Sequence, residues 1–131
     1  MTAKLIDCGG RRVLLLAADG PLVGARRDAA DLSGEALQQG ARVIAAPAAR
    51  LDPAFFILSS GLAGEFLQTL VNYRRIFAVV GDIAAHTARS APLRDFVRES
   101  NRGRSVLFVA DLKTLAARIE PGALGDDGGW G

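Results

Sequence analysis

One short stretch decides the fold: residues 76–82, which read IFAVVGD. Five consecutive apolar residues end at a glycine and an aspartate, and such an unbroken run is typical of a strand covered on both faces. Strands of this kind pair in parallel, because a helix carries the chain from the end of one strand back to the start of the next. The stretch therefore predicts an α/β protein with a mostly parallel sheet.

Further strand-like runs lie on both sides of it. They are residues 13–18 (VLLLAA), 43–46 (VIAA) and 106–110 (VLFVA). Residues 3–8 are expected to form a short, weakly patterned strand. The pair Gly9-Gly10 joins it to the next run, and two glycines in this position favour a tight hairpin, because both can adopt positive φ. The first strand is therefore expected to pair antiparallel with the second.

Amphipathic segments alternate with these strands. Asp28 is the predicted N-cap of the first helix, and Asp52-Pro53 is predicted to open a short helical turn. A longer helix should span about residues 60–73, with its apolar side chains on one stripe. Ser90 and Asp111 are the predicted caps of two further helices. The order is therefore β-β-α-β-α-β-α-β-α, a mixed, mostly parallel five-stranded sheet flanked by helices.

The length of 131 residues fits one domain, which we expect to span residues 1–120, followed by a glycine-rich, disordered tail at residues 121–131. No apolar run approaches the roughly 20 residues that cross a bilayer, and the first residues lack the apolar core of a signal peptide. The single cysteine, Cys8, allows no internal disulfide. Together these features favour a cytoplasmic protein without a membrane partner.

Charge also limits the function. Sixteen basic and 14 acidic residues give a net charge of +2, which is too small to favour nucleic acid as a partner. Fourteen of the basic residues are arginine, and seven of these fall between residues 74 and 104. Arginine forms bidentate pairs with carboxylate and phosphate. Two interpretations remain open: ordinary surface ion pairs, or a rim that faces an anionic partner.

Several segments resemble one bacterial family. They are residues 55–68 (FFILSSGLAGEFLQ), 72–74 (NYR), 81–82 (GD) and 93–103 (LRDFVRESNRG). The family is described only as domain of unknown function 4180, and the resemblance covers nearly the whole chain except the tail. The family often has lysine after the glutamine, where this chain has Thr69. Because the family has no established activity, the resemblance implies no catalytic residue.

A second resemblance is to the STAS domains of anti-anti-sigma factors and sulfate-transporter tails. These domains share the predicted order of elements and carry Asp-Ser-Ser-Gly at the start of the second helix. A partner kinase phosphorylates the first serine of that signature. Here Ser59-Ser60-Gly61 stands at the same place, preceded by Leu58 instead of aspartate. The resemblance implies that Ser59 carries the regulated hydroxyl, on a STAS-like fold.

The start of the longer helix is the first candidate site. Free backbone N–H groups and the helix dipole at Ser59, Ser60 and Gly61 favour an anion, and the same residues also suit a plain N-cap. Asp82 follows the carboxyl end of a strand, where open α/β sheets usually bind ligands. His86, in the loop that follows, could act as a base near Asp82. A loop cap and a surface histidine are the structural alternatives.

Two polar helix faces complete the candidates. Glu65, Gln68 and Asn72 share one stripe of the longer helix and could contact another subunit, a ligand or solvent. The helix that begins near Ser90 is densely charged, and its candidates are Arg94, Asp95, Glu99 and Asn101. These side chains suit either an anionic partner or a solvated face.

The sequence contains none of the common catalytic motifs. It has no Walker loop, no Gly-x-Gly-x-x-Gly after a strand and no Gly-x-Ser-x-Gly elbow. One cysteine and one histidine cannot build a four-ligand zinc site. We therefore expect no metal and no cofactor, and we favour a non-enzymatic regulatory or protein-interaction module.

Three functional hypotheses follow. In the first, the module binds a protein partner or a second copy of itself, with a phosphate switch at the start of the longer helix. In the second, the domain binds or converts a small anionic ligand with the loop that follows residues 76–80. In the third, arginine side chains make the protein a nucleic-acid adaptor.

Overall fold

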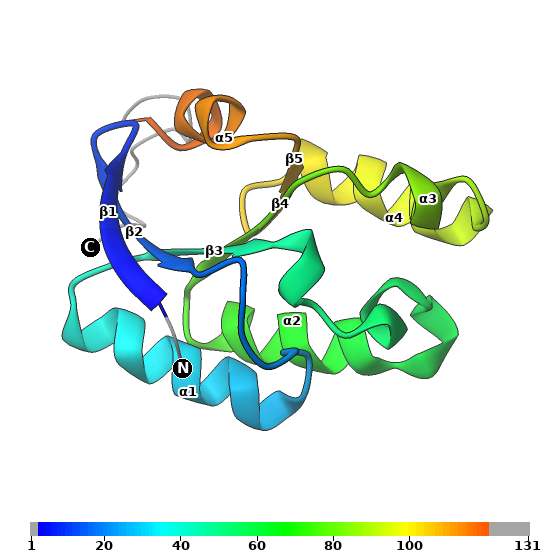
Figure 1. Cartoon of the computed structure of the whole chain (residues 1–131), viewed down its shortest axis with the longest axis horizontal. Helices are drawn as coiled ribbons and strands as arrows, with labels where there is room; N and C mark the ends of the chain where they lie inside the picture. Colours follow the sequence, from blue (N-terminus) through cyan, green and yellow to red (C-terminus); the bar gives the residue numbers. More distant parts are fainter. Residues whose placement is uncertain (1–2, 121–131) are drawn as a thin grey trace.

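The computed structural model describes residues 3–120. Its five strands stand side by side in chain order: β1 (Ala3–Cys8), β2 (Arg11–Leu16), β3 (Val43–Pro47), β4 (Ile76–Val80) and β5 (Val106–Val109) (Figure 1). β1 pairs antiparallel with β2, and all other neighbours are parallel. The predicted mixed, mostly parallel five-stranded sheet is confirmed. The disordered tail predicted for residues 121–131 lies outside the described residues.

The hairpin between β1 and β2 turns on two glycines. Gly9 and Gly10 have φ values of 62° and 80°, the left-handed region that a two-residue hairpin turn requires. A Cβ on Gly9 would also lie 2.5 Å from the carbonyl oxygen of Ala116, in the last helix. Glycine is therefore needed here both for the turn and for the close approach of that helix.

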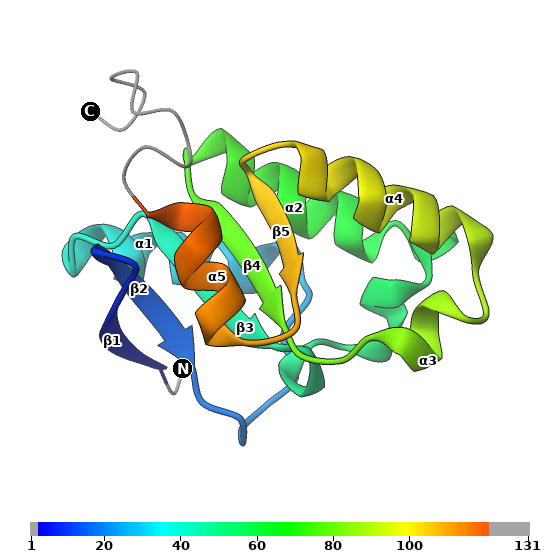
Figure 2. The ribbon, with the colours of Figure 1, turned by 90° about the horizontal axis from the view of Figure 1, so that it is seen from above.

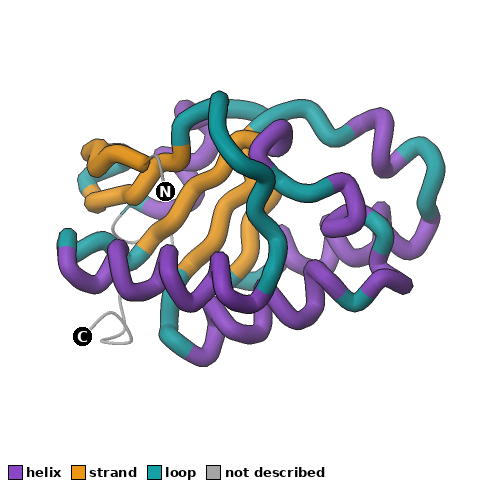
Figure 3. Tube along the Cα trace, turned by 60° about the horizontal axis from the view of Figure 1, so that its bottom comes forward, coloured by secondary structure: helices purple, strands orange, loops and turns teal. Residues whose placement is uncertain are grey.

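Three helices cover one face of the sheet. They are α1 (Arg26–Gln38), α2 (Leu62–Asn72) and α4 (Ala91–Arg102). Their buried side chains pack with alternate residues of the strands into the larger core. Phe66 of α2 lies at its centre, with ring centroids 5.8 Å from Phe55 and 5.1 Å from Phe77, both edge to face. Figure 3 shows the strands running between the helical layers.

The opposite face is covered by α5 (Leu112–Ile119), which crosses the strands in Figure 2. Leu115 and Ile119 are fully buried against Val13, Ala78 and Leu107. Because both faces bury aliphatic side chains, β3 and β4 are buried along all but their last residue. This is the arrangement that the unbroken apolar runs predict.

Short helices connect the sheet to α2 and α4. Three 3₁₀ turns follow β3: η1 (Ala48–Arg50), η2 (Pro53–Phe56) and η3 (Leu58–Ser60). Asp52 opens η2 by accepting from the backbone N–H of Ala54 at 2.9 Å, as Asp52-Pro53 predicts. After β4, one helical turn, α3 (Ala84–Thr87), occupies a segment expected to be a loop. Four residues are too few to show a helical period.

The cap of α1 differs from the prediction. Ala25, not Asp28, is the N-cap residue, and α1 begins at Arg26. The Asp28 carboxylate reaches back to accept from the backbone N–H groups of Gly24 and Ala25, both at 3.0 Å. Asp28 thus supports the helix start from the third helical position, because a carboxylate there can satisfy donors that precede the helix. The predicted caps Ser90 and Asp111 are confirmed.

Within residues 3–120, no helix has both the length and the apolar character needed to cross a membrane.

Candidate functional site

A crevice opens beyond the carboxyl end of the parallel strands, between the turns that precede α2 and those that precede α4. Its volume is about 530 Å³, within the range of ligand and peptide pockets. The lining residues come from both sides: Pro53, Phe56, Ile57, Leu58 and Ser59 from the η2–η3 segment, and His86, Arg89, Ser90 and Pro92 from α3 and the start of α4. The walls are mainly apolar, with serine, histidine and arginine at intervals.

The two predicted serines have different environments. Ser60 Oγ donates to the carbonyl of Ala54 at 2.7 Å and accepts from the backbone N–H of Leu62 at 3.2 Å. Gly61 follows with φ of 79°, which turns the chain into α2. Ser60 therefore helps to hold the start of the helix. Ser59 is exposed and lines the crevice, so its hydroxyl is accessible to a partner.

His86 forms part of the opposite wall. Its ring stacks on Phe56, with centroids 4.1 Å apart and an interplanar angle of 12°. The position of α3 is fixed at its start by Asp82, whose Oδ1 accepts from the backbone N–H of Ala84 at 2.8 Å. It is fixed at its end by Arg94, whose Nη1 donates to the carbonyl of Thr87 at 2.7 Å. The structure thus brings His86 and Ser59 into one crevice.

Asp82 lies in a neighbouring cavity. That cavity has a volume of about 280 Å³ and is otherwise lined mainly by apolar residues, among them Ile83, Val97 and Phe108. Asp82 is exposed, and its carboxylate caps α3. The contacts of Asp82 are therefore those of a loop cap, the structural alternative given above. Asp82 does not line the crevice that holds Ser59.

The polar stripe of α2 is exposed to solvent. Glu65, Gln68 and Asn72 are all exposed, and Gln68 Nε2 donates to Asn72 Oδ1 at 2.9 Å across one helical turn. This is an ordinary i, i+4 pair. The stripe is available to a partner, but none of the three residues lines the crevice.

The predicted residues of α4 are held in local contacts. Asp95 and Glu99 pair with the next basic residue on the same face, Arg98 at 3.7 Å and Arg102 at 3.5 Å. These pairs are largely exposed, so they contribute little. Asn101 binds the outer edge of β5: its Nδ2 donates to the carbonyl of Phe108 at 3.2 Å, and its Oδ1 accepts from the same residue's N–H at 2.8 Å.

Only Ser59 and His86 of the nine lining residues were among the predicted site residues, and Phe56 and Arg89 are the two additions with a clear role in the crevice. Phe56 supplies the surface on which His86 stacks, and Arg89 supplies a cation beside the predicted cap Ser90. No pattern in the sequence marks Phe56 or Arg89, because it is the fold that leaves the neighbouring Ile57 57% exposed in the crevice wall. Apolar side chains that a fold leaves at its surface often mark a binding surface.

The single cysteine and the possible metal ligands are the remaining side chains that could carry chemistry. Cys8 is buried, and its thiol donates to the carbonyl of Leu112 at 3.6 Å. Burial, and then the charge of Asp7, raises the pKa of the Cys8 thiol above its ordinary value, which disfavours the reactive thiolate form. Over residues 3–120 there is no group of three or more His, Cys, Asp or Glu side chains that could hold a metal.

Residues 8–119 match a protein family described as "Domain of unknown function (DUF4180)". Comparisons with curated proteins and with solved structures found no match. The matched segment runs from the end of β1 to the last residue of α5, so every residue of the crevice lies within it.

Proposed function

The chain belongs to the DUF4180 family, and from that premise we propose that it is a non-enzymatic regulatory module that binds a protein partner through the crevice around Ser59. The observation that carries the proposal is an apolar crevice of about 530 Å³ with an accessible serine in its wall. A partner's apolar side chain fits such walls, and contacts of this kind supply most of the binding energy at protein interfaces.

Ser59 is the proposed switch. Because Ser60 makes the hydrogen bonds that hold the helix start, Ser59 can be modified without loss of a cap. A protein kinase would transfer the γ-phosphoryl group of ATP to the Ser59 hydroxyl, releasing ADP and a proton. The product adds a charge of roughly −1.5 to −2 to the crevice wall, which disfavours an apolar partner and favours pairing with Arg89. The STAS-like order of elements supports the same position.

Phosphopeptide mapping tests the switch. We expect that incubation of the protein with cell lysate and ATP labels Ser59, that Ser59→Ala loses the label, and that Ser105→Ala keeps it. Ser105 is a suitable control because it is also exposed and lies outside the crevice. Absence of phosphate on Ser59, or equal labelling of Ser59→Ala, would contradict the proposal.

A binding measurement tests the crevice itself. We expect Ile57→Asp and Ser59→Glu each to weaken retention of the protein partner on the immobilised domain at least about tenfold. Each substitution places a charge where apolar contact is needed. Leu22→Asp is the matched control, since Leu22 is 52% exposed and lies in the connection between β2 and α1, outside the crevice. If Leu22→Asp weakens retention as much as Ile57→Asp, the crevice is not the binding surface.

One observation favours a second candidate function. His86 and Arg89 line the crevice together, and both can donate hydrogen bonds to an anion. A small phosphorylated or carboxylated metabolite could then occupy the crevice instead of a protein. Thermal shifts with a metabolite panel distinguish the two: only the metabolite hypothesis predicts stabilisation that Arg89→Gln removes. We also propose that the protein is cytoplasmic and that it assembles with a second copy of itself.

A further inference from the structure

An aliphatic cavity lies beside α5, near the carboxyl ends of β2, β3 and β4. Its volume is about 460 Å³. The described lining comes from the first two residues of β1, the end of β2 and the two residues after it, the last residues of β3 and β4, and the first residue of α5. Every described lining side chain except Lys4 is alanine, leucine, valine or proline. The aliphatic cavity therefore has walls that favour an apolar ligand.

The cavity exists because α5 covers its face of the sheet only in part. α5 has eight residues and is about 12 Å long, and it crosses the sheet toward the hairpin between β1 and β2 (Figure 2). Near the amino ends of the strands, Val13 and Val43 are fully buried on this face. Near the carboxyl ends, Leu15, Pro47 and Val80 are only half-buried. The uncovered part of the face is the floor of the aliphatic cavity.

Lys4 supplies the one charge among the described lining residues. It lies opposite Leu15 in the antiparallel pair of β1 and β2, so both side chains project from the same face of the sheet. Lys4 is exposed, and its aliphatic stem can follow the cavity wall while the ammonium group stays in water at the rim. Within residues 3–120, no side chain forms an ion pair with Lys4. The ammonium group is therefore available to an anionic ligand.

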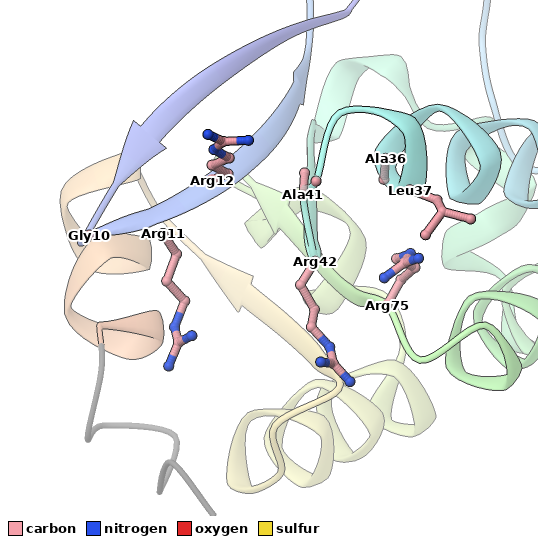
Figure 4. Close-up of a pocket in the computed structure, with 9 residues that line it drawn as sticks. Gly10, Arg11, Arg12, Ala36, Leu37, Ala41, Arg42 and Arg75 are labelled. Carbon is pink, nitrogen blue, oxygen red and sulfur yellow. The ribbon is translucent and has the colours of Figure 1, made fainter. Parts of the chain in front are cut away.

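The cavity at the amino ends of the parallel strands differs, because the fold uses its cations. Its volume is about 360 Å³, and four arginines line it: Arg11, Arg12, Arg42 and Arg75 (Figure 4). Arg11 and Arg12 extend to opposite sides of β2, where they donate to the carbonyls of Ile119 in α5 and of Gln39 after α1. These guanidinium groups support helix ends and do not converge on one ligand.

We propose that the aliphatic cavity binds a medium-chain fatty acid, with the carboxylate at Lys4 and the chain along Leu15, Val80 and Leu112. A volume of about 460 Å³ lies within the range of small-molecule pockets, which combine apolar walls with a few polar groups. One cation in an otherwise apolar lining fits a ligand with one anionic end. The described lining has no aromatic ring, so it offers no stacking surface to an aromatic acid. This site is separate from the crevice around Ser59 and does not depend on the function proposed for it.

Calorimetric titration of the full chain with hexanoate, octanoate and decanoate tests the proposal. We expect one acid to bind per chain, with the affinity rising about tenfold for every two methylene groups added, because each buried methylene contributes about 0.8 kcal/mol. Phenylacetate should bind more weakly than octanoate. Octylammonium should bind at least about tenfold more weakly than octanoate, because it places a second cation beside Lys4.

The charge is tested by exchanging the two lysines of the chain one at a time. Lys4→Gln should weaken octanoate binding about three- to fivefold, the value of an exposed ion pair, and should leave the affinity for uncharged 1-octanol unchanged. Lys113→Gln is the matched control: it removes the same charge from an exposed position on α5 that does not line the cavity. It should leave the affinity for octanoate within about 1.5-fold.

The space is tested by filling the cavity. Ala17 is half-buried and lines it, so Ala17→Leu should weaken octanoate binding at least about tenfold. Ala117→Leu is the matched control, because Ala117 is exposed on α5 and does not line the cavity. The melting temperature of each variant without ligand shows whether it is folded. If Ala17→Leu is not folded, the two lysine variants and the series of chain lengths decide the matter.

Four results would overturn the proposal. They are the absence of binding of all three acids by the folded wild-type protein at about 1 mM, an affinity that does not depend on chain length, saturation at several acids per chain, and equal loss of octanoate affinity in Lys4→Gln and Lys113→Gln. Sedimentation of the wild type gives a fifth: a dimer that Ala17→Leu dissociates and octanoate does not would show that a second copy of the chain fills the cavity.

Discussion

Arg50 shows how one side chain can fix a loop. It is 1% exposed, and its guanidinium donates to the carbonyls of Pro21 at 2.9 Å, Ala17 at 2.8 Å and Asp19 at 3.2 Å. These carbonyls belong to the connection between β2 and α1. Gly20 in the same connection has φ of 141°, and a Cβ there would lie 2.9 Å from Arg50 Cζ. Arg50 therefore supplies donors to backbone groups that secondary structure leaves unpaired.

Replacement of Arg50 by methionine should destabilise the protein by about 3 kcal/mol, because buried carbonyls lose their donors while the apolar stem is largely kept. Urea unfolding followed by circular dichroism measures the loss. Arg98→Met, at an exposed position, should change stability by less than about 0.5 kcal/mol. A change below about 1 kcal/mol for Arg50→Met would show that the connection does not depend on this side chain.

Sequence reasoning at the residue scale identified the crevice only in part. The segment Ser59–Gly61 was placed at a helix start by its small polar residues, and this placement holds. His86 and Arg89 reach the same crevice because of the path that α3 gives the chain. The four residues of α3 are too few to show a helical period in the sequence. The cavity at the start of the parallel strands was not predicted for a similar reason: Arg12, Arg42 and Arg75 line it together only because of strand register.

At the scale of elements, arginine side chains from elsewhere in the chain meet the ends of the longer helices. Gln39 after α1, Arg74 after α2 and Ile119 in α5 accept from Arg12, Arg42 and Arg11. Arg118 of α5 donates to the carbonyl of Asn101 near the end of α4 at 2.7 Å. A cation at a helix C-terminus is favourable both as a donor and through the dipole. This accounts for part of the preference for arginine without any ligand.

The elements themselves were well predicted, because their signals are local. The apolar run of β4 was given its observed limits, and the caps Ser90 and Asp111 were placed correctly. Two predictions were wrong. α3 was expected to be a loop because its sequence signal is only four residues long, and the start of α1 was misplaced because Asp28 supports it indirectly. In α1 the aspartate acts from inside the helix, and sequence alone does not distinguish that position from the cap.

The cap of α5 gives a prediction for pH. Hydrogen bonding from the backbone N–H of Thr114 lowers the pKa of Asp111 below its ordinary value. A lowered pKa in the folded state means that the carboxylate stabilises the protein above the unfolded-state pKa, and that this contribution is lost as pH falls through the folded-state pKa. We expect Asp111→Asn to melt slightly below the wild type at pH 7, with the difference shrinking as the pH falls below about 4, the ordinary pKa of an aspartate.

Asp111→Ala separates the cap from the charge. It should melt below both other proteins at pH 7, because alanine offers no acceptor to Thr114, whose N–H lies 2.8 Å from Asp111 Oδ1. Differential scanning calorimetry from pH 3 to pH 8 provides the comparison. A gap between the wild type and Asp111→Asn that stays constant over this range would contradict a role for the charge.

For the molecule as a whole, the two ends of the parallel strands differ in which helix ends lie beside them. Helices that follow parallel strands begin near the carboxyl ends of the strands (the carboxyl edge) and end near their amino ends (the amino edge). The carboxyl edge therefore holds the helix starts and the crevice around Ser59, and the amino edge holds helix ends and the arginines. The aliphatic cavity lies beside α5 and includes Leu15, Pro47 and Val80 in its lining, so one helix does not fully cover its face.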